Sequence, residues 1–83
     1  QNLGVLWVEG RTLREHLIAA GIDLHREVVI FHNSRLLTVS EWDIVCPVPG
    51  DLINVEATVS GGDDGSNPIA MVLSIAVMIS API

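Results

Sequence analysis

Hydrophobic and polar residues recur along this chain with the spacing of strands and of one helix. The stretches "LGVLWVE" (residues 3–9) and "EVVIFH" (residues 27–32) are rich in aliphatic and aromatic residues, as strands are. "NSR" is a tight turn into a short strand, "LLTV". Between residues 52 and 59, apolar residues fill every second position, as in a strand with one buried face. The pattern therefore predicts three main strands and one short one.

A helix is predicted between the first two strands, in "TLREHLIAAG" (residues 12–21). Thr12 is a suitable N-cap, and Glu15 three residues later completes a capping box. Leu13, Leu17, Ile18 and Ala20 form the expected buried stripe, and Gly21 supplies the left-handed residue that ends many helices. The start, the end and the apolar face of this segment all indicate the same short helix.

The segment "SEWDIVCPVPGD" is predicted to be a loop with a short helical turn, because Pro47 and Pro49 exclude a regular helix there. Residues 1–60 then form an α+β roll, with one helix across a mixed sheet. The residues expected in its core are Trp7, Leu13, Leu17, Val29, Phe31, Trp42, Ile53 and Val55.

A flexible linker is predicted over residues 61–67, because "GGDDGSN" contains no large apolar side chain. Its hinge positions are Gly61, Gly62 and Gly65. After the linker, Asn67 is a suitable N-cap and Pro68 suits the first helical position. The sequence therefore predicts a separate helical segment over residues 68–83.

This last segment carries no charged residue and shows no polar face at helical spacing. A helix that is apolar all round must be buried in protein or in lipid. It rises roughly 22 Å, which is less than the roughly 30 Å of a bilayer core. The alternatives are that the helix is buried against other subunits, against the chain's own sheet, or against a membrane. The expected anchor residues are Ile69, Met71, Val72, Leu73, Ile75, Val77, Met78 and Ile79.

Charge argues against nucleic acid as a partner. The chain of 83 residues has ten acidic residues and four arginines, for a net charge of −6. Phosphate binding needs a basic stripe, and the arginines are scattered. A single cysteine, Cys46, excludes an internal disulfide, and its apolar surroundings "DIVCPV" predict a buried, inert thiol.

Candidate chemistry is sparse. His16, His25 and His32 include no pair with the i, i+4 spacing of helical metal ligands. "GDDGSN" lacks the alternating oxygen ligands and the closing glutamate of a calcium loop. Neither a Ser–His–Asp arrangement nor a phosphate-binding loop stands out, so we assign no catalytic, cofactor-binding or metal-binding residues.

Several motifs of residues 3–62 resemble the β-grasp sulfur carriers of the thiamine and molybdopterin pathways: "GRTLREHL", "VVIFHNSRLLTVSEW", "PGDLINV" and the closing "SGG". The resemblance implies a β-grasp roll, in which a further strand precedes the strand at residues 3–9. In the carriers the Gly-Gly carboxylate is the reactive terminus. Here Gly61 and Gly62 are followed by more chain, so this function needs a proteolytic cut after Gly62.

The whole chain is also similar to the N-terminal region of tail-tip proteins of long-tailed bacteriophages. These include the host-specificity (central hub) protein of lambda-like phages and its small tail-assembly partner. "GSNPIAMVLSIAVMISAP" is the most distinctive part. The resemblance implies a non-enzymatic virion component at the distal tail, in contact with other tail-tip proteins and acting in assembly, host attachment and genome delivery. An uncharged helix behind a flexible linker would then be held inside the tip, and we hypothesise that it is released toward the host envelope when the tip opens.

Overall fold

The computed structural model describes residues 1–60 and 70–82, which form one α-helix, one short 3-10 helix and one five-stranded sheet. The α+β class predicted from the sequence, with one helix on a mixed sheet, is confirmed. The elements are β1 (Asn2–Leu6), α1 (Leu13–Ala19), β2 (Val28–His32), β3 (Arg35–Leu37), η1 (Val39–Asp43, the 3-10 helix), β4 (Leu52–Ser60) and β5 (Ala70–Ser80).

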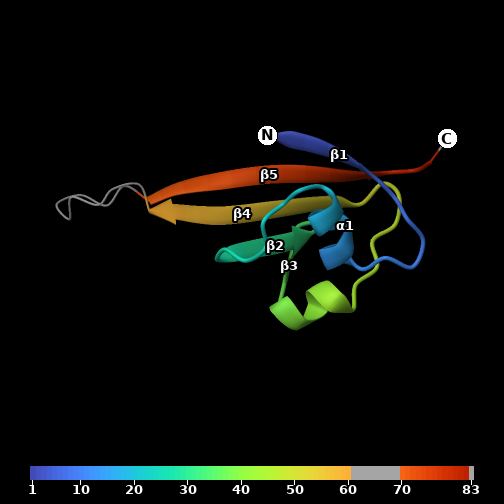
Figure 1. Cartoon of the computed structure of the whole chain (residues 1–83), viewed down its shortest axis with the longest axis horizontal. Helices are drawn as coiled ribbons and strands as arrows, with labels where there is room; N and C mark the ends of the chain where they lie inside the picture. The colour runs from blue at the N-terminus through green and yellow to red at the C-terminus, as the bar shows by residue number, and fades with distance from the viewer. Residues whose placement is uncertain (61–69, 83) are drawn as a thin grey trace.

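The strands lie in the order β1-β5-β4-β2-β3. β1 runs parallel to β5, and all other neighbours are antiparallel, so the sheet is mixed. β4 and β5 form a long ribbon that extends past both flanking strands, as Figure 1 shows. Along this ribbon β1 pairs only with residues 76–80 and β2 only with residues 53–57.

Residues 70–80 form a strand, so the apolar helix predicted over residues 68–83 is wrong for this part of the chain. β5 pairs with β4 from Met78 opposite Leu52 to Ala70 opposite Ser60, and with β1 on its other side. Its β-branched residues favour a strand, and two neighbouring strands satisfy its main-chain groups. The predicted helix start, Asn67 and Pro68, lies outside the described residues, as do Ile69 and the hinge glycines 61, 62 and 65.

The residues predicted as an apolar anchor are divided by the strand between its two faces. Val77 and Ile79 are fully buried in the core, and Ile75 is half-buried beside them. Leu73 and Met78 are exposed. Met71 and Val72 are part of β5, but their side chains lie outside the described set. β5 is therefore a central strand with a buried face. Within the described residues, no helix is long and apolar enough to cross a membrane.

The core lies between α1 and one face of the sheet. Leu13 and Leu17 of α1 are fully buried against Ile30, Ile53 and Val77, and Val55, Leu37, Trp42 and Ile79 complete the cluster. Five of the predicted core residues are confirmed there: Leu13, Leu17, Trp42, Ile53 and Val55.

Val29 is 46% exposed, so its prediction as a core residue is wrong. In β2 the core face carries Val28, Ile30 and His32, because side chains alternate along a strand. Phe31 lies on the same side as Val29 and is half-buried, as is Trp7, which packs against the edge of the core. "EVVIFH" is apolar at consecutive positions, so the sequence pattern could not choose between the two faces.

The helix begins as predicted, but the prediction of a buried Ile18 is wrong, because this residue is 57% exposed. Thr12 caps α1 by accepting a hydrogen bond from the Glu15 N–H, and Glu15 accepts one from the Thr12 N–H. Gly21 follows with a φ of +84°, a left-handed conformation that glycine adopts without strain. The helix is therefore short, and it covers only part of one face of the sheet.

Candidate functional site

The face of the sheet opposite α1 carries side chains from all five strands of the described chain. We call it the open face, and it is built by alternate residues of all five strands, because the register places side chains of the same face opposite one another. Its members are Asn2, Gly4 and Leu6 of β1, Ser74, Ala76, Met78 and Ser80 of β5, Leu52, Asn54 and Glu56 of β4, Val29 and Phe31 of β2, and Leu36 of β3.

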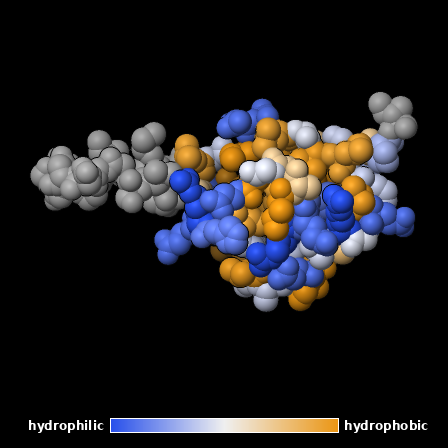
Figure 2. Space-filling model, viewed as in Figure 1, coloured by the Kyte–Doolittle hydropathy of each residue, from blue (hydrophilic) through white to orange (hydrophobic). Residues whose placement is uncertain are grey.

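Large hydrophobic side chains lie uncovered on the open face. Leu6 is 60% exposed, Leu36 57% and Met78 45%, in addition to Val29. Leu36 lies opposite the half-buried Phe31 across the β2–β3 hairpin, so apolar groups from neighbouring strands meet. Asn54 and Glu56 are the polar residues between them on β4. Hydrophobic residues also reach the surface elsewhere, between polar ones, as Figure 2 shows.

A polar cluster around Asp51 lies at one end of the sheet, where β2 ends and β4 begins. The His32 Nε2–H donates to one oxygen of the Asp51 carboxylate at 2.7 Å, and Asn33 Nδ2 donates to the other at 3.1 Å. The Val48 N–H adds a third hydrogen bond at 3.0 Å. Partial burial acts to raise the pKa of Asp51, but the hydrogen bonds from His32, Val48 and Asn33 outweigh it and hold this pKa below its usual value.

This cluster joins the β2–β3 turn to the turn before β4. Asn33 and Ser34 form the β2–β3 turn with φ values of 49° and 72°, and Asn33 also exchanges hydrogen bonds with the main chain of Leu52. The turn before β4 is thereby tied to the hairpin. The sequence predicted the first turn at "NSR" and placed "PGD" in the loop before the last strand, but nothing there showed that the two meet.

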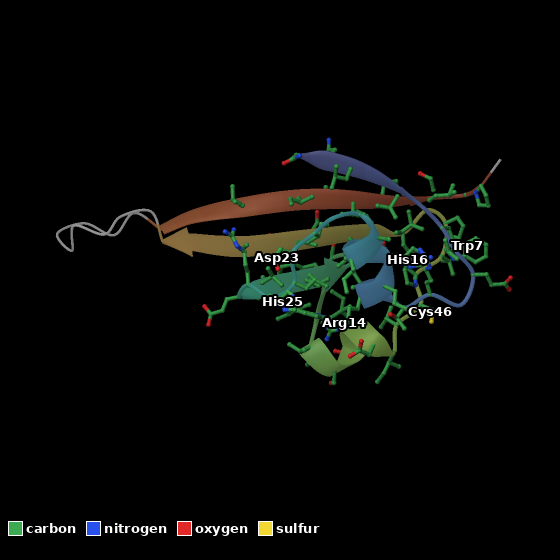
Figure 3. The ribbon with its side chains drawn as sticks, in the orientation of Figure 1. Trp7, Arg14, His16, Asp23, His25 and Cys46 are labelled. Carbon is green, nitrogen blue, oxygen red and sulfur yellow. The ribbon has the colours of Figure 1, made fainter. Side chains whose placement is uncertain are left out.

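His16 is buried on α1 and has partners on both ring nitrogens. Its Nε2 accepts from the Val8 N–H at 3.0 Å, and its Nδ1 donates to the Thr12 carbonyl at 2.9 Å. These hydrogen bonds require the neutral ring with its proton on Nδ1. His16 therefore holds the β1–α1 connection on the helix, and Figure 3 shows it there beside Trp7. Nothing in the sequence pattern predicted this role.

Figure 3 shows Trp7 and Cys46 in the same half of the molecule as His16. The Trp7 Nε1–H donates to the Pro47 carbonyl at 2.9 Å, which ties the β1–α1 connection to the loop before β4. The prediction of a buried Cys46 is wrong, because its residue is exposed. The loop between η1 and β4 instead buries Pro47, and Cys46 points away from the core beside it.

The three histidines have separate surroundings. His16 is in the core, His32 is hydrogen-bonded to Asp51, and His25 is exposed on the connection between α1 and β2, where Figure 3 shows it near Asp23. Across residues 1–60 and 70–82, no group of three or more His, Cys, Asp and Glu side chains is arranged to hold a metal ion.

Comparisons of this chain with protein-family models, with curated proteins and with solved structures found no match.

Proposed function

We propose that this chain is a structural, non-enzymatic component of the tail tip of a long-tailed bacteriophage and that it acts through protein–protein contacts. The observation that carries the contact function is the open face, where Leu6, Val29, Leu36 and Met78 are exposed together. Uncovered hydrophobic surface of this kind is typical of interaction sites. The assignment to a tail tip rests on the order of motifs along the sequence.

We further propose that the helix and sheet are a variant of the β-grasp roll. The resemblance to sulfur carriers implies a strand ahead of residue 3, and β5 takes a place inside the sheet, between β1 and β4. Residues 70–80 then complete the domain, so attachment within the tail tip uses the open face in place of an apolar helix.

The alternative function, a sulfur carrier or ubiquitin-like modifier, needs a cut after Gly62. Such a cut would separate β5 from the rest of the chain. β5 contributes the buried Val77 and Ile79, and within the described residues it is the only strand that pairs with β1. Since the loss of a central strand removes both its ladders and part of the core, this geometry favours the structural function.

The direct test is to purify virions of the phage that encodes this chain and to measure the intact mass of the chain in the tail fraction. We expect the uncut chain, or a longer protein that contains it, in purified tails. A cellular species that ends at Gly62, or one whose mass shows oxygen replaced by sulfur at that terminus, would contradict the proposal.

A matched pair of variants tests the open face. We expect Leu36→Asp to reduce incorporation into tails without unfolding the domain, because the Leu36 side chain is already 57% exposed. Ile18→Asp is the control, because Ile18 is equally exposed on α1, away from the open face. Equal incorporation of both variants would argue that the open face makes no contact in the tail.

A further inference from the structure

A cleft of about 580 Å³ lies beside β2, between the α1–β2 connection and the 3-10 helix η1. Its apolar lining comes from Leu24, Val28, Val29, Val39 and Trp42, and its charged lining from Arg14, Arg26, Glu27 and Glu56. It therefore combines an apolar floor with charged groups of both signs, and it is separate from most of the open face.

The main chain of Val28 is unpaired along this cleft. β3 pairs only with residues 30–32 of β2. Because the turn between the two strands has two residues, the main-chain N–H and C=O groups of His32 and Ile30 face β3. The Asn33 N–H bonds to the Leu52 carbonyl, which shows that odd-numbered residues face β4. By this alternation the N–H and C=O of Val28 face the side of β3, beyond the point where β3 ends.

β3 ends at Leu37 and therefore does not reach far enough to pair with Val28. At Thr38 the chain turns into η1, and the Thr38 N–H donates to the Glu41 carboxylate at 2.9 Å. No other strand of the described residues lies on this side of Val28. An unpaired sheet edge of this kind is a template for another strand.

Trp42 contributes an aromatic ring to the cleft lining. The residue is only 4% exposed, and its indole nitrogen is itself buried, with no acceptor among residues 1–60 and 70–82. The Arg14 guanidinium lies 5.2 Å from the centre of the ring. A ligand in the cleft therefore meets Trp42 as an aromatic, apolar wall.

The charges in the cleft lining indicate one feature of that ligand. Two of the four arginines of this acidic chain line the cleft. Arg14 is engaged by both oxygens of Asp43, at 2.7 and 3.3 Å. Arg26 has only a 3.9 Å contact with Asp23, and its side chain is 59% exposed. Because Glu27 and Glu56 also line the cleft, the position beside Arg26 is the favourable one for an acidic group.

We propose that this cleft binds an extended peptide segment of a partner protein, which adds as a strand beside Val28 and places an acidic side chain near Arg26. Such a segment supplies the main-chain groups that Val28 lacks and places apolar side chains on the cleft floor, against the ring of Trp42. The inference does not rest on the tail-tip function, although the cleft shares Val29 and Glu56 with the open face.

The test uses the full chain labelled with ¹⁵N and a set of capped heptapeptides in which Val and Thr alternate and one Asp occupies each position in turn. We expect at least one peptide to shift the amide signal of Val28 and the indole signal of Trp42. The same peptide with Asn in place of Asp should bind more weakly, and Arg26→Gln should abolish this difference.

Two proline variants test the added strand. Val28→Pro removes an N–H that faces no strand of the protein, so we expect the domain to stay folded and the Kd of the peptide to rise about fivefold to tenfold. Val29→Pro removes an N–H that faces β4, and we expect it to unfold the domain. Arg26→Gln, at a side chain that is 59% exposed, covers the case in which Val28→Pro fails to fold: it should weaken binding of the Asp peptide and leave that of the Asn peptide unchanged.

Leu36→Asp is the control on the open face and should leave the Kd unchanged. The proposal is overturned if no peptide shifts the Val28 and Trp42 signals at millimolar concentration. It is also overturned if the shifts centre on the part of β5 that does not pair with β1, or on Leu6, Leu36 and Met78 of the open face. Shifts that arise with protein concentration alone would overturn it as well, because they would show pairing with a second copy of the chain.

Discussion

At the scale of single residues, buried or half-buried polar side chains hold the connections of this domain together. His16 bridges the main chain at Val8 and Thr12, and Asp51 joins two turns. Each satisfies groups that a loop would otherwise leave without partners in a partly buried site. Their contribution to stability comes chiefly from the groups that would be left unpaired without them.

His16→Ala should therefore lower the free energy of unfolding by about 1–3 kcal/mol, because it leaves the Val8 N–H without its acceptor and removes one of the two hydrogen bonds that the Thr12 carbonyl accepts. Urea unfolding followed by tryptophan fluorescence measures the change. His25→Ala is the control at an exposed position and should stay within about 0.5 kcal/mol of the parent chain. Equal effects of the two substitutions would show that the His16 bridge contributes nothing.

The carboxylates give the domain a defined response to acid. The pKa of Glu15 and that of Glu41 lie below their usual value, each mainly through a hydrogen bond from a main-chain N–H at Thr12 or Thr38. The pKa of Asp51 is also lowered. Since these folded-state pKa values lie below the unfolded ones, the stabilisation is present above about pH 4 and is lost as the pH falls through the folded-state values.

Asp51→Asn should accordingly flatten the fall in stability on acidification, because one of these carboxylates is gone, and it should lower stability at neutral pH. Urea midpoints measured between neutral and acidic pH give the slope. Glu9→Gln, which removes an exposed carboxyl outside the cluster, controls for the change in net charge. An unchanged slope in Asp51→Asn would rule out a stabilising role for the Asp51 cluster.

At the scale of elements, α1 and β5 differ in how far their own sequence specifies them. α1 has a cap at Thr12, a glutamate at the matching position and two leucines on one face, and the structure confirms all of these. β5 has an uncharged run without a polar period, which fits a buried helix and a buried strand equally well. Its conformation depends on the neighbours β4 and β1, which only the tertiary structure provides.

Adjacent residues of β5 should therefore respond differently to substitution. Ile79→Ala should lower the free energy of unfolding by about 2–5 kcal/mol, because the side chain is only 1% exposed in the core. Met78→Ala should have a small effect, since Met78 lies on the open face. Thermal or urea unfolding measures both. Comparable losses for the two would argue against the strand assignment.

At the scale of the whole molecule, β5 makes residues 1–60 and the apolar segment parts of one sheet. It closes the core with Val77 and Ile79 and separates β1 from β4. The loop before β4 is also tied to it, since the Gly50 N–H donates to the Ile79 carbonyl at 2.8 Å. Stability of the domain is therefore shared between the two ends of the chain.

A chain that ends at Gly62 should not fold, because it lacks these core side chains and the partner strand of β1. Circular dichroism and the dispersion of amide signals measure this directly. Addition of a synthetic peptide of residues 63–83 should restore the folded spectrum by supplying β5. A folded 1–62 fragment would remove the structural objection to the carrier function.

The sequence by itself determined the capped helix, the alternation in residues 52–59, the turns and the α+β class, because each depends on contacts between residues close in the chain. It also identified five of the nine buried hydrophobic residues of the described core, but it missed Ile30 and Leu37. It placed Val29 in the core instead, because consecutive apolar residues left the buried face of β2 undefined. Only the tertiary structure decided that residues 70–80 form a strand, that His32 is hydrogen-bonded to Asp51 and that the main chain of Val28 has no partner strand on the side of β3. These depend on which segments become neighbours, and sheet pairing is set by partners far apart in sequence.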